Sequence, residues 1–144
     1  MKRTILRTQS GFSLFEVMVV VVILGILATI IVPKLTGRTE QARVAKARND
    51  IQVLETALDL YKLDNGIYPS TDQGLQALIE EPATEPLPRD WRPGGYVKRL
   101  NNDPWGHPYQ YLNPGDHNEI DIFSYGADGQ LGGEGANAEI GNWE

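Results

Sequence analysis

The sequence contains no cysteine and only two histidines in 144 residues. Without cysteine, no disulfide can hold a loose segment in place, so such a segment needs another means of stabilisation. His107 and His117 lie in turn-rich stretches, and neither has the spacing of a Ser–His–Asp site or of a histidine metal site, which argues against an enzyme. The formal net charge of −6 argues against nucleic-acid binding and suits the binding of a divalent cation.

Charge is almost absent from residues 12–32, where Glu16 is the single ionisable side chain. A helix of this length, at about 1.5 Å per residue, reaches the roughly 30 Å of a bilayer core. A run that is apolar all round is typical of a membrane span or of a helix buried on every side. Residues 1–11 are basic and lack acids, and no cleavage site of small residues follows the run before Pro33. We therefore expect an export signal whose apolar run stays in the mature protein.

The junction between the basic leader and the apolar run reads Ser-Gly-Phe-Ser-Leu-Phe-Glu over residues 10–16. It resembles the type IV prepilin signal, in which a membrane-bound prepilin peptidase cuts after the glycine and methylates the new amino terminus. The resemblance implies cleavage between Gly11 and Phe12 and N-methylation of Phe12. A cut at this bond removes the basic leader and leaves the hydrophobic anchor whole.

Glu16 is costly inside a membrane, by about 2.5–3.5 kcal/mol on insertion scales, so it needs a partner. In one interpretation, the free amine of Phe12 in one subunit pairs with Glu16 of its neighbour and sets the register of assembly. In the other, Ser13 and Glu16 form a capping box at the start of the helix. The two interpretations are compatible, and the sequence leaves both open.

Beyond Pro33, apolar residues recur at steps of three and four, which predicts an amphipathic helix. Asp64-Asn65-Gly66 is a stop signal, so we expect one helix of roughly fifty residues that ends under a globular head. Pro33 either kinks this helix at the membrane exit or marks a boundary, and both interpretations stay open. The predicted buried stripe consists of Val44, Ala47, Ile51, Leu54, Leu58 and Tyr61.

The head region shows short elements separated by turns. Ser70 and Gln73 have the spacing of a capping box before a short helix. Residues 108–112 and 120–124 alternate in the manner of strands, and the Asn-Pro-Gly-Asp between them is a turn signal. We expect an antiparallel hairpin that faces the helical stripe. Residues 96–100 are predicted to form a further short extended segment.

The C-terminal segment, residues 126–143, is rich in glycine and in oxygen-bearing side chains, namely Asp128, Glu134, Asn137 and Glu139. Glycine-rich chain loses much entropy on ordering and buries little surface. Calcium accepts six to eight oxygen ligands, including backbone carbonyls, so it suits such a segment. The spacing is not that of an EF-hand, and a floppy polar tail is the alternative.

Taken in order, several short motifs resemble the major pseudopilin of the type II secretion system, the general secretion pathway protein G family. The resemblance covers essentially the whole chain and rests on an ordered set rather than on any one motif. Besides the prepilin signal, the set comprises residues 61–65, 68–69, 73–75, 95–100, 103–106, 126–129 and 140–143.

The resemblance implies an α+β, type IV pilin-like fold. In that fold a long N-terminal helix, with a membrane-spanning first half, packs on a small antiparallel β-sheet head with a metal-stapled C-terminal loop. It also implies a single-pass protein of the Gram-negative inner membrane with a periplasmic head and no catalytic residues. Such subunits form a homopolymer, the periplasmic pseudopilus, and work with minor pseudopilins and an inner-membrane assembly platform. The filament drives export of folded exoproteins across the outer membrane.

The family also binds calcium in its C-terminal loop. Asp128 matches the aspartate of the Gly-x-Asp-Gly motif, and Glu139 stands where the family usually has a second aspartate. Further ligands implied by the resemblance are backbone carbonyls near Ser124 and Gln130, with Asn137 added because it lies nearby in sequence.

These expectations divide the chain into three parts. Residues 1–11 form the prepilin leader, residues 12–35 the transmembrane and assembly half of the helix, and residues 36–144 the periplasmic head with the amphipathic half. A type IV pilin of a surface fibre, for adhesion or motility, is the alternative function. The lack of cysteine argues against it, because many such pilins close a C-terminal loop with two cysteines.

Overall fold

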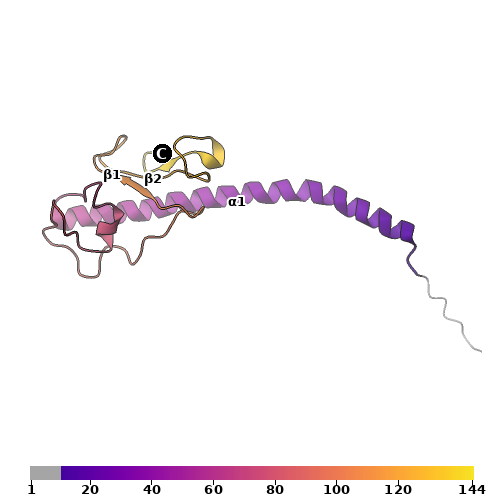
Figure 1. The fold of residues 1–144 in the computed structure, drawn as a ribbon, viewed down its shortest axis with the longest axis horizontal. Coiled ribbons are helices and arrows are strands. Elements are labelled where there is room, and N and C mark those ends of the chain that lie inside the picture. Colours follow the sequence, from indigo (N-terminus) through magenta and orange to yellow (C-terminus); the bar gives the residue numbers. More distant parts are fainter. Residues whose placement is uncertain (1–10) are drawn as a thin grey trace, which may run out of the picture. The chain divides into compact units, whose positions relative to one another are not determined.

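The structure is a computed structural model that describes residues 11–144, apart from the side chains of residues 29–36. The chain divides into two compact units, residues 1–39 and residues 40–144. Helix α1 (Leu14–Asn65) begins in the first unit and ends in the second (Figure 1). Helix α1 is continuous through Pro33, so Pro33 does not end the helix, and a kink there stays a prediction.

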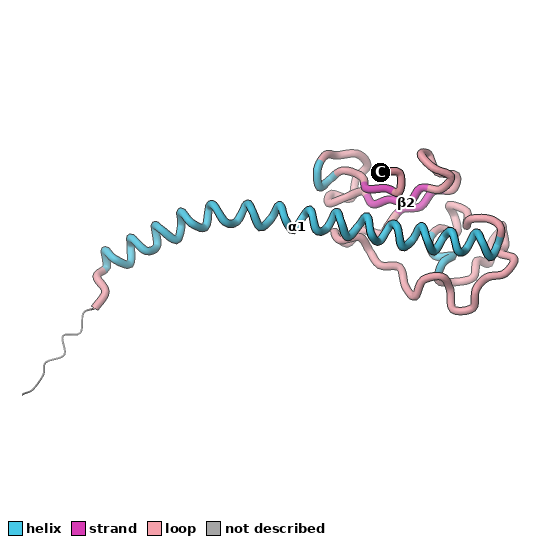
Figure 2. The backbone as a smooth tube through the Cα atoms, turned by 180° about the vertical axis from the view of Figure 1, so that it is seen from behind, coloured by secondary structure: helices cyan, strands magenta, loops and turns pink. Residues whose placement is uncertain are grey.

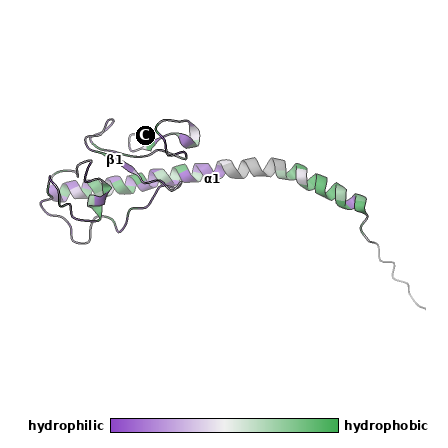
Figure 3. Cartoon of the chain, viewed as in Figure 1, coloured by the Kyte–Doolittle hydropathy of each residue, from purple (hydrophilic) through white to green (hydrophobic). Residues whose placement is uncertain are grey.

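The part of α1 in the second unit carries the core stripe that its periodicity predicts. Ala47, Ile51, Leu58 and Tyr61 are at most 2% exposed, and they pack in one cluster with side chains of the head. The hydropathy colouring changes accordingly, from mostly hydrophobic in the first described turns of α1 to mixed in the later turns (Figure 3). The single-stripe pattern therefore identifies the face that packs against the head.

The helix ends where the stop signal predicts. Gly66 has a φ of +80°, and its N–H donates to the carbonyl of Lys62 (2.7 Å), so glycine supplies the left-handed residue that closes the last turn. The side-chain amide of Asn65, which is buried, donates to the carbonyl of Tyr61 (2.9 Å) and to the hydroxyl of Tyr96 (3.0 Å). This end of α1 is thus bonded to the segment around Tyr96, thirty-one residues further along the chain.

The sheet has three antiparallel strands in the order β1-β2-β3 (Figure 2). Strands β1 (Gln110–Leu112) and β2 (Asp121–Ser124) form the predicted hairpin, with Tyr111 opposite Ile122. Both of these side chains join the core cluster with the stripe of α1, as expected. Strand β3 (Ile140–Gly141), which the sequence did not indicate, pairs with β2.

The remaining elements are two short 3₁₀ helices, η1 (Leu75–Leu78) and η2 (Gly135–Asn137). The predicted Ser70–Gln73 box is present before η1: the N–H of Ser70 donates to Gln73 Oε1 (3.0 Å) and the N–H of Gln73 donates to Ser70 Oγ (3.2 Å). The extended segment predicted at residues 96–100 is wrong. Residues 96–98 form a bend instead, because the N–H of Tyr96 donates to the carbonyl of Leu78 at the end of η1 (2.7 Å).

Candidate functional site

The predicted cleavage bond lies in an exposed, non-helical stretch just before α1. Gly11, Phe12 and Ser13 have no regular secondary structure, and the side chain of Phe12 is 86% exposed. A peptidase needs an extended, accessible backbone at the bond it cuts. The bond between Gly11 and Phe12 is exposed and lies outside any helix or strand, which suits such a cut.

Glu16 and Ser13 form the capping box that was one of the two interpretations of the sequence. The N–H of Ser13 donates to Glu16 Oε2 (2.8 Å), and the N–H of Glu16 donates to Ser13 Oγ (3.2 Å). Two backbone donors at the start of α1 are satisfied in this way. Pairing of Glu16 with the amine of a second subunit stays a prediction, because the structure contains one chain.

The first described turns of α1 expose large apolar side chains all round. Their exposed fractions run from 41% at Val19 to 80% at Leu14. A contiguous apolar surface of this kind marks a membrane or protein contact. The exposed set comprises Leu14, Phe15, Val17, Met18, Val19, Val20, Val21, Val22, Ile23, Leu24, Ile26 and Leu27.

Over the residues that the structure describes, none of the helices combines the length and the apolar character that crossing a membrane requires. The predicted membrane-spanning half, residues 12–35, includes residues 29–35, whose side chains lie outside the described set.

The second candidate site is the C-terminal loop, residues 125–139, which joins β2 to β3. It consists of a first limb, residues 125–130, and a second limb, residues 132–139. The N–H of Ala127 on the first limb donates to the carbonyl of Ala136 on the second (2.9 Å). Within the second limb, the N–H of Gly132 donates to Glu139 Oε1 (3.4 Å). The two limbs therefore lie against each other.

Gly126 makes this approach of the limbs sterically feasible. It has a φ of +78°, and a Cβ at this position would lie 2.6 Å from the carbonyl oxygen of Ala138 and 2.8 Å from that of Ala136. A side chain at residue 126 would collide with both. Two carbonyl oxygens of the second limb consequently lie beside the backbone of the first.

The predicted metal ligands lie on both limbs and differ in the exposure and hydrogen bonding of their side chains. Asp128 is exposed, and its Oδ1 accepts a hydrogen bond from the N–H of Gln130 (3.1 Å). Glu139 is half-buried and belongs to the second limb, and Asn137 is exposed at the end of η2. The Ser124 side chain is fully buried and donates its hydroxyl to another carboxylate, so only its backbone carbonyl is a candidate ligand.

Among the described residues, no group of three or more acidic or histidine side chains is placed to hold a metal ion. The loop offers instead Asp128 on the first limb, Glu134, which is exposed, and Glu139 on the second, and backbone carbonyls. This all-oxygen donor set fits calcium, which accepts carbonyl ligands in flexible geometry, and does not fit zinc.

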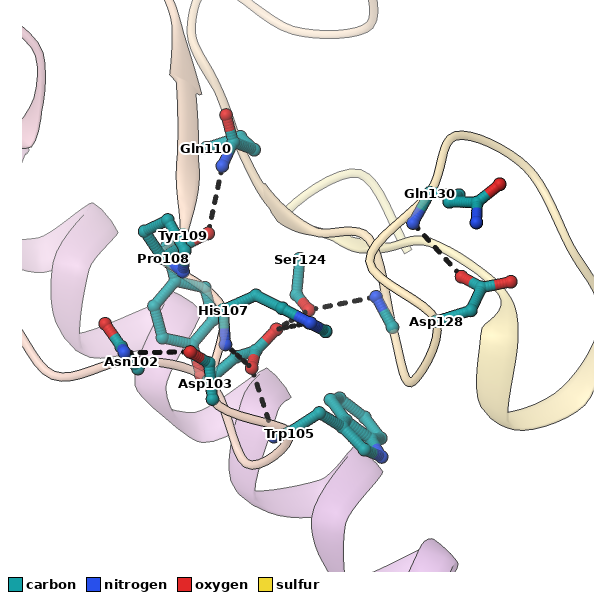
Figure 4. Close-up of polar contacts among 12 residues, drawn as sticks. Asn102, Asp103, Trp105, His107, Pro108, Tyr109, Gln110, Ser124, Asp128 and Gln130 are labelled. Carbon is teal, nitrogen blue, oxygen red and sulfur yellow. Dashed lines mark hydrogen bonds and ion pairs between the residues drawn. The ribbon is translucent and has the colours of Figure 1, made fainter.

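A buried carboxylate that the sequence did not single out lies at the start of the loop. Asp103 is 4% exposed and stands in the turn before β1. Its Oδ2 accepts a hydrogen bond from the hydroxyl of Ser124 (2.5 Å), the last residue of β2, as Figure 4 shows. A single aspartate in a turn has no partner at a recognisable spacing, so the sequence indicated only that Asp103 belongs to the motif of residues 103–106.

The far end of the loop is held by Asn142, which follows β3. Its side-chain amide donates to the carbonyl of Ile120 (3.1 Å) and to Glu55 Oε1 on α1 (3.1 Å), and its Oδ1 accepts from the N–H of Ile122 (3.1 Å). The loop is therefore bonded to the folded head at both ends.

A second buried carboxylate, Asp121, organises the connection between β1 and β2. It accepts hydrogen bonds from the backbone N–H groups of Asp116, His117 and Asn118 at 2.7–3.0 Å, and His117 Nδ1 lies 3.0 Å from its Oδ2. Burial alone would raise the pKa of Asp121, but these hydrogen bonds outweigh it and hold the pKa below its ordinary value. The imidazole of His117 stacks on Trp143 with ring centroids 4.0 Å apart.

Comparison with known families gives two matches that together cover almost the whole chain. The family described as "Type II secretion system (T2SS), protein G" matches residues 34–143, and the "Prokaryotic N-terminal methylation motif" matches residues 6–32. The second match covers the predicted cleavage site and the apolar run.

Individual relatives agree with this result. The chain is 63% identical over 138 residues to a type II secretion system core protein G of Vibrio cholerae serotype O1, covering 96% of this chain and 94% of the relative. It is 55% identical over 138 residues to the protein of the same name in Pseudomonas aeruginosa, covering 96% and 97%.

A solved structure is also similar, the crystal structure of the major pseudopilin from the type 2 secretion system of enterohaemorrhagic Escherichia coli. It is 49% identical and superposes with a TM-score of 0.69, covering 78% of this chain and 96% of the other. The α+β, pilin-like fold expected from the sequence is confirmed by this likeness.

Proposed function

Since the chain belongs to the type II secretion system protein G family, we infer that it is the major structural subunit of a secretion pseudopilus. It polymerises in the periplasm, and the filament drives export of folded exoproteins across the outer membrane. The observation that carries this function is the division of α1: its first turns expose apolar side chains all round, whereas its later turns bury one stripe in a folded head. A subunit built in this way has a surface for assembly and a separate stable domain. Its role is structural, and we assign it no catalytic residue.

Processing and anchoring follow from the segment around Gly11. Prepilin peptidase cuts between Gly11 and Phe12 and methylates the amine of Phe12, in keeping with the methylation motif over residues 6–32. The apolar segment then holds the subunit in the Gram-negative inner membrane as a single span with its head in the periplasm. The intact mass of the protein from its host tests this step: a mass that begins at Phe12 and includes one methyl group is expected, and an uncut Met1 would contradict it.

Assembly places the amine of Phe12 in one subunit beside Glu16 of the next. The capping box is compatible with this contact, because Ser13 N–H occupies Oε2 and a carboxylate has about four acceptor positions over its two oxygens. Neutralising both charges removes the cost of holding them in an apolar environment. The homopolymer grows on the inner-membrane platform together with minor pseudopilins.

Cross-linking tests the homopolymer directly, since the chain has no native cysteine to compete. A contact between Phe12 and Glu16 offsets neighbouring subunits by about four residues, or roughly one helical turn. Cysteines replacing Leu14 and Met18 should therefore form disulfides between successive subunits and give a ladder of oligomers under oxidation. The matched control, Leu14→Cys alone, can give at most a dimer. A dimer limit for the paired variant as well would contradict this arrangement.

The C-terminal loop binds calcium in this proposal. Asp128 on the first limb and Glu139 on the second are the carboxylate ligands, and Ser124 and Gln130 contribute backbone carbonyls, with Asn137 as an additional oxygen ligand. The support is that both limbs lie against each other and that the candidate ligand atoms are all oxygens. When bound, the cation supplies a cross-link between the limbs that a cysteine-free loop cannot obtain from a disulfide.

A thermal melt of the full chain in detergent, with calcium, with magnesium and with chelator, tests this assignment. A ligand present at 100 times its dissociation constant stabilises the folded state by about 2.7 kcal/mol. We expect chelation to lower the melting temperature and calcium, but not magnesium, to restore it. Asp128→Asn should remove the difference. Identical melts in all three conditions would show that the loop holds without metal and that Glu139 is no ligand.

A further inference from the structure

Asp103 connects the turn before β1 to the C-terminal loop, although it belongs to neither limb. Its carboxylate is 4% exposed, and its Oδ1 accepts hydrogen bonds from the N–H groups of Trp105 (3.0 Å) and His107 (2.8 Å). These two bonds fix the orientation of the carboxylate within its own turn, residues 103–107. Oδ2 is left to face the loop.

From Oδ2 a short series of hydrogen bonds leads into the first limb. The hydroxyl of Ser124 donates to Asp103 Oδ2 (2.5 Å), and the same Oγ accepts from the N–H of Gly126 (3.1 Å). Figure 4 shows this series between Asp103 and the limb that carries Asp128. The hydrogen bond to the ionised carboxylate is of the stronger, charge-assisted kind.

A second contact joins the same turn to the same limb. Gly129 has a φ of +67°, and a Cβ at this position would lie 2.9 Å from Cε1 and Nε2 of the His107 imidazole. The backbone on either side of Asp128 is thus held at Gly126 through Asp103 and at Gly129 by His107.

We propose that Asp103 is a positioning residue for the calcium site: through Ser124 it orders the first limb so that Asp128 is in place before the cation arrives. This inference rests on the calcium binding proposed above. We do not assign Asp103 as a ligand, because its carboxylate is 4% exposed and already accepts three hydrogen bonds from protein donors. Ordering a glycine-rich limb costs conformational entropy, and a limb ordered beforehand binds more tightly because less of that cost falls on the binding step.

The experiment compares three variants of the full chain in detergent by calorimetric titration with calcium chloride. Asp103→Asn keeps the size of the side chain and removes the charge that orients the Ser124 hydroxyl. Ser124→Ala removes the hydroxyl and leaves the backbone carbonyl, a proposed ligand, in place. Asp121→Asn is the matched control, because Asp121 is also a buried carboxylate that accepts backbone N–H groups but has no bond to the loop. Each variant is also melted in chelator to measure the stability of the metal-free head.

We expect Asp103→Asn and Ser124→Ala to weaken calcium binding at least roughly tenfold, and the double variant to weaken it no further than the stronger single one. Asp121→Asn should lower the melting temperature in chelator and leave the calcium dissociation constant unchanged. If Asp103→Asn does not fold, Ser124→Ala decides alone.

Calcium binding of wild-type strength in Ser124→Ala or in a folded Asp103→Asn would overturn the positioning role while leaving the calcium site intact. An equal loss of affinity in Asp121→Asn would overturn it too, since the effect would then follow stability. No calcium uptake by the wild type would instead refute the proposed calcium site, and this inference with it.

Discussion

Replacing Asn142 by alanine should destabilise the head strongly, because this one side chain holds the far end of the C-terminal loop. Its three hydrogen bonds reach Ile120, Ile122 and Glu55, at 3.1 Å each. Ile120 and Ile122 are at most 4% exposed. Without Asn142, the carbonyl of Ile120 and the N–H of Ile122 would therefore be buried without a hydrogen-bond partner and without access to water. At about 1–3 kcal/mol for each of these two unsatisfied buried groups, the substitution should cost about 2–6 kcal/mol of unfolding free energy.

A thermal melt followed by circular dichroism in chelator measures this loss without any contribution from a cation. For a head of about a hundred residues, each kcal/mol lowers the melting temperature by about 4 °C or more, so it should fall by roughly 8–24 °C. Asn118→Ala is the matched control, since its amide makes one long bond to the Asn142 carbonyl (3.4 Å) and is exposed. A fall of under about 2 °C for Asn142→Ala, or an equal fall for the control, would refute the reasoning.

Three further changes probe other parts of the chain. The depressed pKa of Asp121 means that its carboxylate stabilises the head at pH values above the ordinary pKa of 3.8, and that this stabilisation is lost as the pH falls below 3.8. Asp121→Asn should therefore flatten the fall in melting temperature between pH 5 and pH 3. An unchanged slope would contradict this. Gly129→Ala should cost about 1–3 kcal/mol in a chemical denaturation curve, because it puts a Cβ against His107 at a positive φ, and a curve like that of the wild type would disprove the contact. Glu16→Gln keeps an oxygen for the Ser13 N–H, so helix content by circular dichroism should stay the same while the cross-linked ladder disappears; a persistent ladder would exclude pairing with Phe12.

The parts of the fold that the sequence predicted are those set by local periodicity and turn chemistry. The stripe of α1 follows from 3.6 residues per turn, and the turn between β1 and β2 from its Asn-Pro-Gly-Asp signal. Strand β3 has two residues, too few to show any alternation. Residues 96–98 have the composition of a strand, but they bend because the N–H groups of Tyr96 and Val97 both donate to the carbonyl of Leu78. No local sequence pattern predicts this contact.

In the candidate sites, too, contacts between residues close in sequence could be predicted and contacts between distant residues could not. The Ser13–Glu16 box could be predicted, since both partners lie within one turn of helix. The roles of Asp103 and Asp121 could not, because each depends on where the chain returns in space. Asp103 meets Ser124 across 21 positions, and only the folding of β1 onto β2 brings the two together. The only sequence signal for Asp103 was its place in the Asp-Pro-Trp-Gly motif.

The measurement that tests the account most directly is where exported enzymes accumulate when this gene is deleted from its host. Enzyme activity is assayed separately in the periplasm and in the medium, with a cytoplasmic marker to exclude lysis and with complementation by the wild-type gene and by Glu16→Gln. We expect exported enzymes to be retained in the periplasm of the deletion strain, to return to the medium with the wild-type gene, and to stay in the periplasm with Glu16→Gln. Unchanged secretion together with a loss of surface fibres would contradict the account and identify the chain as a pilin of a surface fibre.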